Sequence, residues 1–306
     1  MQKEDITQEE KQTIKARTTK VQNDQIKKWL ICSGRVLITA AKTTNLIRKA
    51  SKLHNLTKTT TAVLGRCLTM MALMGTKLSS PKANITAVIQ GDGPVGKITA
   101  VAMQNAVVKG YMQNPNVELN LNDKGKLDVG GAVGKNGKLR VAMDLGFGYP
   151  YSGEVDLVSG EIAEDFTHYY YHSLQQPCAI CLGVLVDKDN TCISGAGLLI
   201  EVLPDATEED IVQVEQIVSK LNDFSKIMQD KTLEDFATIY LPNGQDLQRD
   251  FTPKFECKCS KAKLKKIIKG LSEQTIREIF EKDDTVFAHC DFCNKTIGID
   301  KKDILG

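Results

Sequence analysis

The chain contains 306 residues, which is long enough for about two domains and for at least one sizeable apolar core. Its 40 Lys and Arg residues nearly balance 38 Asp and Glu residues, and 42% of all residues are hydrophobic. This composition excludes a wholly disordered or collagen-like chain, and also a protein that binds nucleic acid through a strong overall positive charge.

No targeting or membrane segment is visible in the sequence. The first thirty residues contain no apolar run, so no signal peptide is predicted. The most apolar stretch, residues 62–78, includes Arg66 and Lys77 and is shorter than the ~20 residues that cross a bilayer. We therefore expect a cytoplasmic protein with no membrane partner, whose nine cysteines serve metal binding or redox chemistry rather than a disulfide framework.

The first part of the chain alternates between polar and helical patterns. Residues 1–25 are polar and mixed in charge, which predicts a flexible extension. A short strand is predicted at 36–38, followed by a helix that begins near Thr43 and a second helix over 59–78. The second helix is apolar nearly all round, as is typical of a helix buried in the middle of a domain.

Residues 84–144 read as an antiparallel meander rather than as alternating strands and helices. Runs of β-branched residues are separated by turn residues such as those at 114–116, 123–125 and 136–137. A helix is predicted over 161–173, followed by strands at 180–186 and 197–203. The sequence thus predicts an α+β core domain with an antiparallel sheet over residues 26–204.

The charge pattern changes after Pro204. A helix is predicted from Asp205 or Thr207 onward, in a segment, residues 205–235, where nine acids outnumber three lysines. Residues 254–269 then contain seven lysines and one acid. These blocks predict a helical linker over 205–250 and a small basic module over 251–306. We expect the basic module to stabilise the acidic linker.

Two glycine-rich motifs lack the context that phosphate binding requires. The segment from Gly91 to Gly96 matches the dinucleotide fingerprint, but a predicted strand follows it instead of a helix, which indicates a hairpin turn. The segment from Gly130 to Lys135 has one residue too few for a P-loop, and Asn136 replaces the Ser or Thr that binds magnesium. We interpret it as another loop and predict no cofactor-binding or nucleotide-binding residues.

Most histidines and cysteines also favour a structural interpretation. His168 and His172 are four residues apart on a predicted helix, but no further ligand at matching spacing completes a metal site. Cys178 and Cys181 have redox spacing, yet a strand follows them where a helix would be needed to lower a thiol pKa. Inert thiols are expected there, and equally at the three other cysteines of the core, Cys32, Cys67 and Cys192. With no catalytic triad pattern, we predict no catalytic residue and no enzyme.

The strongest motif lies near the C-terminus. Two close cysteine pairs, Cys257 with Cys259 and Cys290 with Cys293, are separated by residues 260–289. Four thiolates at this spacing can converge on one Zn²⁺, so one zinc per reduced chain is predicted. A module of roughly 50 residues buries little surface, and zinc binding, worth ~10–16 kcal/mol in small zinc domains, would supply the missing stability.

These cysteine pairs resemble the redox switch of the heat-shock protein 33 family, the 33 kDa chaperonins. The segments 34–36, 64–66, 91–96 and 159–165 are similar to motifs of the same family, and they occur in the same order. The resemblance runs from about residue 25 to the C-terminus. The N-terminal extension and the five additional cysteines depart from the family pattern.

The resemblance implies a chaperone that binds unfolding client proteins without ATP. It implies an inactive, zinc-bound reduced state and an active oxidised state in which Cys257 pairs with Cys259 and Cys290 with Cys293. Zinc release, linker unfolding and homodimer formation would accompany oxidation. Two other functions stay open from the residues: a zinc ribbon that binds nucleic acid through the lysines of 258–269, and a thiol oxidoreductase. The lysine stripe lacks arginine and interleaved aromatic residues, so no nucleic-acid partner is predicted.

Overall fold

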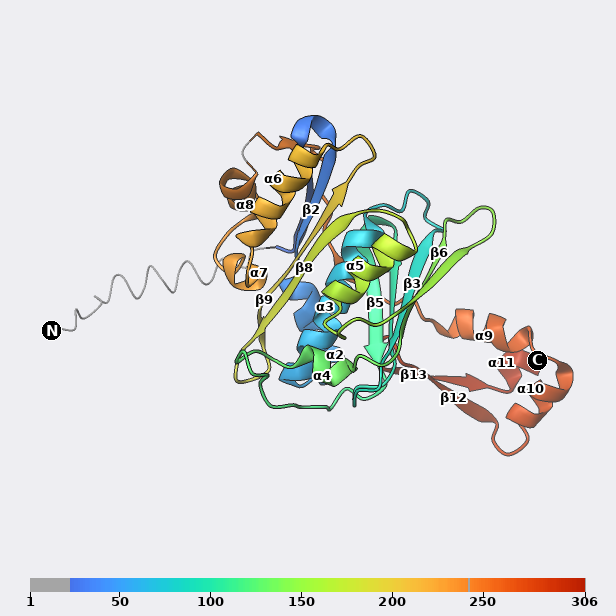
Figure 1. The fold of residues 1–306 in the computed structure, drawn as a ribbon. Coiled ribbons are helices and arrows are strands. Elements are labelled where there is room, and N and C mark those ends of the chain that lie inside the picture. Colours follow the sequence, from blue (N-terminus) through green and yellow to red (C-terminus); the bar gives the residue numbers. More distant parts are fainter. Residues whose placement is uncertain (1–22, 242, 306) are drawn as a thin grey trace, which may run out of the picture.

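The computed structural model describes residues 23–241 and 243–305, and it shows two mostly antiparallel sheets around one central helix (Figure 1). The predicted flexible extension over 1–25 lies almost wholly outside the described residues. The first sheet has the strand order β10-β1-β2-β9-β8, with strands β1 (Gln25–Ile31), β2 (Val36–Lys42), β8 (Cys178–Val186), β9 (Cys192–Val202) and β10 (Gln245–Asp246). The second has the order β11-β5-β4-β3-β6-β7, with strands β3 (Asn84–Gln90), β4 (Ile98–Met103), β5 (Val107–Met112), β6 (Lys138–Asp144), β7 (Tyr151–Asp156) and β11 (Lys254–Phe255). The α+β class and the antiparallel core sheet predicted from the sequence are confirmed.

The central helix is α3 (Lys58–Gly75), and sixteen of its eighteen residues are buried. It packs against β8 and β9 of the first sheet and against β4 and β5 of the second. Thr57 caps the helix, because its hydroxyl accepts the Thr60 N–H while the Thr60 hydroxyl accepts the Thr57 N–H. The two smaller helices, α2 (Thr44–His54) and α5 (Ala163–His172), complete the core beside it. None of the helices in the described part of the chain is long and apolar enough to cross a membrane.

Several strands were missed or misplaced by the sequence patterns. β1 was not predicted, because Lys27 and Lys28 interrupt its apolar side chains; Lys27 instead pairs with acidic side chains, and Lys28 lies over the Phe251 ring. β6 pairs with β3 rather than with β5, so the meander ends after its third strand. The loop expected at 130–135 contains a short helix, α4 (Val129–Val133), which Asp128 caps by accepting the Gly131 N–H.

The acidic segment after Pro204 forms three helices, α6 (Glu208–Ser219), α7 (Phe224–Ile227) and α8 (Leu233–Tyr240). We call these the linker helices. Their buried side chains pack on the outer face of the first sheet and form a second apolar cluster there, with eight residues from the sheet (Trp29, Ile31, Val36, Ile38, Ala40, Ala196, Leu198 and Ile200) and eight from the linker (Val214, Ile217, Leu221, Phe224, Met228, Leu233, Phe236 and Leu241).

The linker helices and the basic segment lie on opposite sides of the core, which corrects the expectation that their opposite charges stabilise the linker by direct contact (Figure 1). Lys261 and Lys265 of the basic segment instead pair with Asp303 inside their own module. This arrangement follows from the first sheet. Side chains on both faces of β9 are buried at nearly every position, so the outer face of the sheet must be covered as well. Apolar burial, and not attraction to the basic segment, positions the acidic helices on this face.

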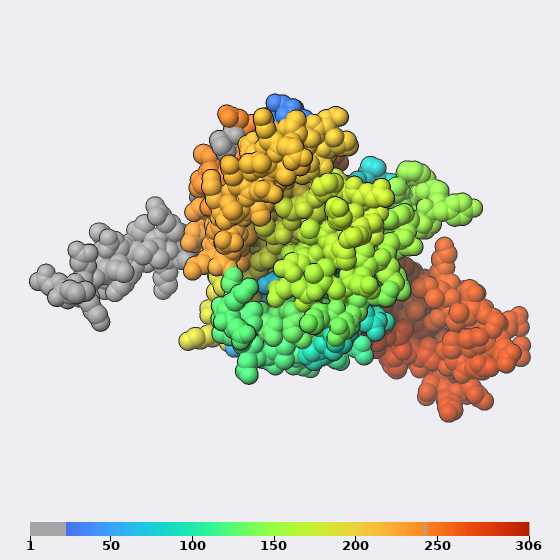
Figure 2. Space-filling view, in the orientation of Figure 1, coloured from blue at the N-terminus to red at the C-terminus, as the bar shows by residue number. Residues whose placement is uncertain are grey.

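The last part of the chain, residues 257–305, forms a small module that projects from the core (Figures 1 and 2). We call it the C-terminal module. It consists of α9 (Lys261–Lys269), α10 (Glu273–Ile279), the hairpin of β12 (Thr285–Cys290) and β13 (Lys295–Asp300), and α11 (Lys302–Leu305). Its own apolar cluster has only five buried members, Ile268, Ile276, Phe280, Ile299 and Ile304. A cluster of this size buries too little apolar surface to stabilise the module by itself.

Residues 243–256, which we call the strap, connect the linker helices to the C-terminal module across the surface of the core. The strap extends both sheets in turn: β10 pairs with β1, Phe251 exchanges two backbone hydrogen bonds with Ile26, and β11 pairs in parallel with β5. Phe251 and Phe255 are 6% and 3% exposed, so the strap is held to the core by two buried rings as well as by backbone hydrogen bonds.

Candidate metal centre

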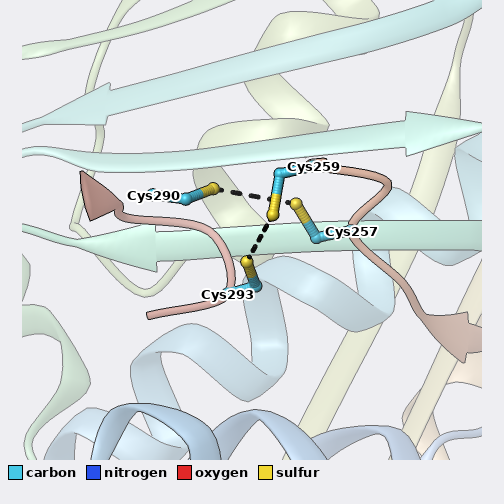
Figure 3. A group of neighbouring side chains, drawn as sticks. All are labelled: Cys257, Cys259, Cys290 and Cys293. Atoms are coloured by element: carbon cyan, nitrogen blue, oxygen red, sulfur yellow. Dashed lines mark hydrogen bonds between the residues drawn. The ribbon is translucent and has the colours of Figure 1, made fainter. Parts of the chain in front are cut away.

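The structure brings all four predicted cysteines of the C-terminal module together (Figure 3). Cys257 and Cys259 follow β11, Cys290 ends β12, and Cys293 lies in the turn that leads to β13. Their sulfur atoms all lie within 4.8 Å of one another. Among the described residues, this is the one group of three or more His, Cys, Asp or Glu side chains that lie close enough together to hold a metal ion.

A backbone turn presents Cys290 and Cys293 on the same side. The N–H groups of Cys293 and Asn294 both donate to the Cys290 carbonyl oxygen, at 3.2 and 2.7 Å. Asn294 adopts a positive φ of 56°, a conformation that asparagine tolerates better than most residues. We refer to residues 290–294 as the knuckle. His289 lies outside the cluster, and its Nδ1 is 3.3 Å from the Thr296 hydroxyl.

The closest sulfur atoms belong to different cysteine pairs. Cys257 Sγ and Cys290 Sγ are 3.8 Å apart, and Cys259 Sγ and Cys293 Sγ are 3.0 Å apart. A tetrahedral zinc site with Zn–S bonds of ~2.3 Å separates its sulfurs by about 3.8 Å. The donor set of four sulfurs and the first of these distances therefore fit a closed zinc site.

The thiols in the cluster influence one another's protonation. Burial, together with the Cys259 side chain, raises the pKa of Cys293 to about 12. Burial also raises the pKa of Cys257. At Cys290 burial acts in the same direction, but hydrogen bonds from the Cys293 thiol and backbone outweigh it, so the pKa of Cys290 is lowered. Four thiols this close together will lose all their protons only when a cation compensates the negative charge of the thiolates.

The other candidate motifs are structural. Residues 91–97 connect the antiparallel strands β3 and β4, which confirms the hairpin interpretation. A Cβ atom added at Gly91 or Gly93 would lie 2.2 or 2.3 Å from the carbonyl oxygens of Val133 and Ala132, so these glycines allow the turn to touch the end of α4. His168 and His172 stack edge-on, with ring centroids 4.2 Å apart, and the His168 ring contacts the Asp156 carbonyl.

The five cysteines outside the cluster have the raised pKa values of inert thiols. Burial raises the pKa to about 11 at Cys32 and Cys181 and to about 12 at Cys67, Cys178 and Cys192. Cys178 packs against the apolar core around α3, whereas Cys181 packs against the second apolar cluster, between the first sheet and the linker helices. They face opposite sides of β8, so their spacing does not create a redox pair.

One contact between core and linker was missed by sequence reasoning. Arg35 Nε donates to Asp210 Oδ2 at 2.7 Å, and its Nη2 donates to Oδ1 at 3.0 Å. Asp210 also closes the capping box of α6, since its side chain accepts the Thr207 N–H. The signal was present in the pattern Thr207-x-x-Asp210, but the arginine partner lies 175 residues earlier in the chain.

Comparison with known proteins identifies relatives along most of the chain. The family model described as "Hsp33 protein" matches residues 24–300. The 33 kDa chaperonin of Thermoanaerobacter sp. (strain X514) is 39% identical over 265 residues, which cover 86% of this chain and 90% of that protein. The 33 kDa chaperonin of Acetivibrio thermocellus is 40% identical over 274 residues, 89% of this chain and 92% of that protein.

A solved structure shares the fold. The crystal structure of the 33 kDa chaperonin (heat shock protein 33 homolog) from Thermotoga maritima superimposes with a TM-score of 0.81 and 30% sequence identity. The match covers 93% of this chain and 97% of that chain. The likeness therefore includes the C-terminal module as well as the two sheets.

Proposed function

The chain belongs to the Hsp33 family of chaperones, and on this premise we propose that it is a redox-regulated, ATP-independent holdase for unfolding proteins. In the reduced state Cys257, Cys259, Cys290 and Cys293 would bind one Zn²⁺ as thiolates. Bound zinc would stabilise the C-terminal module by ~10–16 kcal/mol, as it does in small zinc domains. The observation that carries the proposal is the convergence of the four thiols within 4.8 Å.

Oxidation would convert the four thiols into two disulfides, Cys257 with Cys259 and Cys290 with Cys293. Each disulfide forms when two cysteines lose two electrons and two protons, and one molecule of a peroxide such as H₂O₂ accepts both to become two molecules of water. These pairs differ from the closest sulfur contacts, which connect Cys257 to Cys290 and Cys259 to Cys293. Oxidation would therefore rearrange the cluster and release the metal.

The strap supplies a physical connection between this site and the linker helices. Cys257 follows Phe255 by two residues, and Phe255 belongs to the short strand that pairs with β5. Loss of the metal would loosen the strap at this end, and α8 ends only a few residues before its other end. Detached linker helices would expose the sixteen apolar residues of the cluster between them and the first sheet to client proteins.

The test is light scattering by a thermally unfolding client with the protein reduced or oxidised, each with and without ATP. We expect suppression of aggregation after oxidation only, and equally in both nucleotide conditions. Cys178→Ser serves as a matched control, because it removes a thiol that packs against the core, away from both the four-cysteine cluster and the linker helices, and it should leave activation unchanged. Equal activity of the reduced protein, or a requirement for ATP, would contradict the proposal.

A further inference from the structure

The knuckle contacts the core through one aromatic side chain, which has no part in the zinc binding or disulfide formation proposed above. The ring of Phe292, between the two cysteines, meets the Tyr111 ring edge-on, with centroids 5.0 Å apart and planes at 90°. Lys109 Nζ lies 4.3 Å from the centroid of the same ring. The Asn294 side chain adds a hydrogen bond to the Leu53 carbonyl, at 3.3 Å.

Phe292 serves this contact rather than the interior of its own module. The apolar cluster of the C-terminal module consists of residues from α9, α10, α11, β12 and β13, and Phe292 is not among them. Lys109 and Tyr111 alternate along β5 with the buried Val108 and Gly110, so both lie on the outer face of the second sheet. The ring thus bridges two units that fold around separate cores.

The same strand also positions the other cysteine pair. Lys254 and Phe255 pair with Val107 and Val108, and the Glu256 N–H donates to the Val108 carbonyl at 2.9 Å. Cys257 follows directly in the sequence. β5 therefore holds the Cys257 side of the cluster through its backbone and the Cys293 side through the Phe292 ring.

We infer that Phe292, together with Tyr111 and Lys109, is a positioning residue that couples the metal centre to the chaperone core. This inference deepens the proposed function and rests on its zinc site. While all three groups are in contact, β5 holds both cysteine pairs in the arrangement that binds the metal. Because coupling between two equilibria is reciprocal, a weaker contact on the core lowers the affinity of the cysteines for zinc, and loss of zinc loosens the contact.

The test measures zinc release from the reduced, full-length protein to a chromophoric chelator. Phe292→Ala removes the aromatic pair and the cation–π contact, so release should become about tenfold faster. Phe287→Ala is the matched control, because this ring belongs to the same module but is 73% exposed. It should release zinc at the rate of the unaltered protein.

A variant on the core separates coupling from simple damage to the module. Lys109→Met leaves the C-terminal module unaltered and should speed zinc release about threefold through loss of the cation–π contact. Hydrogen exchange at residues 254–256 should rise in both Phe292→Ala and Lys109→Met, while exchange in β12 and β13 stays slow in Lys109→Met. Unchanged zinc release and exchange in Lys109→Met would overturn the inference. These measurements contain no client, so they decide the coupling even if the protein were to show no chaperone activity.

Discussion

Trp29 on β1 packs edge-on against Phe236 on α8, with ring centroids 6.3 Å apart and ring planes at 63°. It is the single tryptophan of the chain and is 3% exposed. Its indole lies between the core sheet and the linker helices, so its fluorescence reports directly on their contact. Peroxide treatment should shift the emission to longer wavelength as the linker helices detach, and a thiol reductant with zinc should reverse the shift. Emission that stays constant while zinc is released would contradict the coupling between the two sites.

Phe236 is fully buried between Trp29, Phe224 and Tyr240. Phe236→Ala should weaken the docking of the linker helices by ~3–5 kcal/mol, because it removes a large buried ring and leaves a cavity. We expect red-shifted Trp29 emission and suppression of client aggregation without oxidation. Ile239→Ala, on the same helix but 55% exposed, is the control and should behave like the unaltered protein. A Phe236→Ala protein that is still inactive when reduced would show that the linker helices do not cover the client surface.

The ion pair between Arg35 and Asp210 should make linker docking sensitive to acid. The Arg35 guanidinium, followed by the Thr207 N–H, holds the pKa of Asp210 well below its usual range. A carboxylate with a lowered pKa in the folded state contributes stability above its unfolded pKa of ~3.9 and loses that contribution as the pH falls further. Trp29 emission should therefore shift progressively below about pH 4.

Asp210→Asn isolates this effect from other acidic groups. The variant should dock its linker helices more weakly at neutral pH, and the difference from the unaltered protein should shrink as the pH falls below about 4. The measurement is the denaturant midpoint followed by Trp29 emission at each pH. A difference that is constant across the pH range would assign the role of Asp210 to something other than its charge.

The proposed metal ligands can be tested by metal analysis of the reduced protein. A variant with both Cys290→Ser and Cys293→Ser should retain far less than one zinc per chain, because two of four thiolate ligands are lost. The matched variant with Cys178→Ser and Cys181→Ser has the same spacing on β8 and should retain all of its zinc. Full zinc content in the first variant would contradict the proposed site.

The sequence by itself determined the features that depend on neighbouring residues. The spacing of Cys257, Cys259, Cys290 and Cys293 predicted their convergence. The sequence also predicted a helix start at Asp205 or Thr207, and Thr207 is the residue that caps α6. The apolar pattern of residues 59–78 predicted the buried helix α3. Each of these signals lies within a few residues of the structure it specifies, or in a cysteine pattern with few alternative uses.

The tertiary structure decided which distant surfaces meet. β1 becomes a strand although it carries Lys27 and Lys28, because β2 and the strap supply its hydrogen bonds. The linker helices cover the first sheet instead of joining the basic segment, because the apolar outer face of that sheet must be buried. Phe292 looks in the sequence like any residue between two cysteines, and only the fold places β5 beneath it. Contacts of this kind depend on chain topology, which local patterns do not contain.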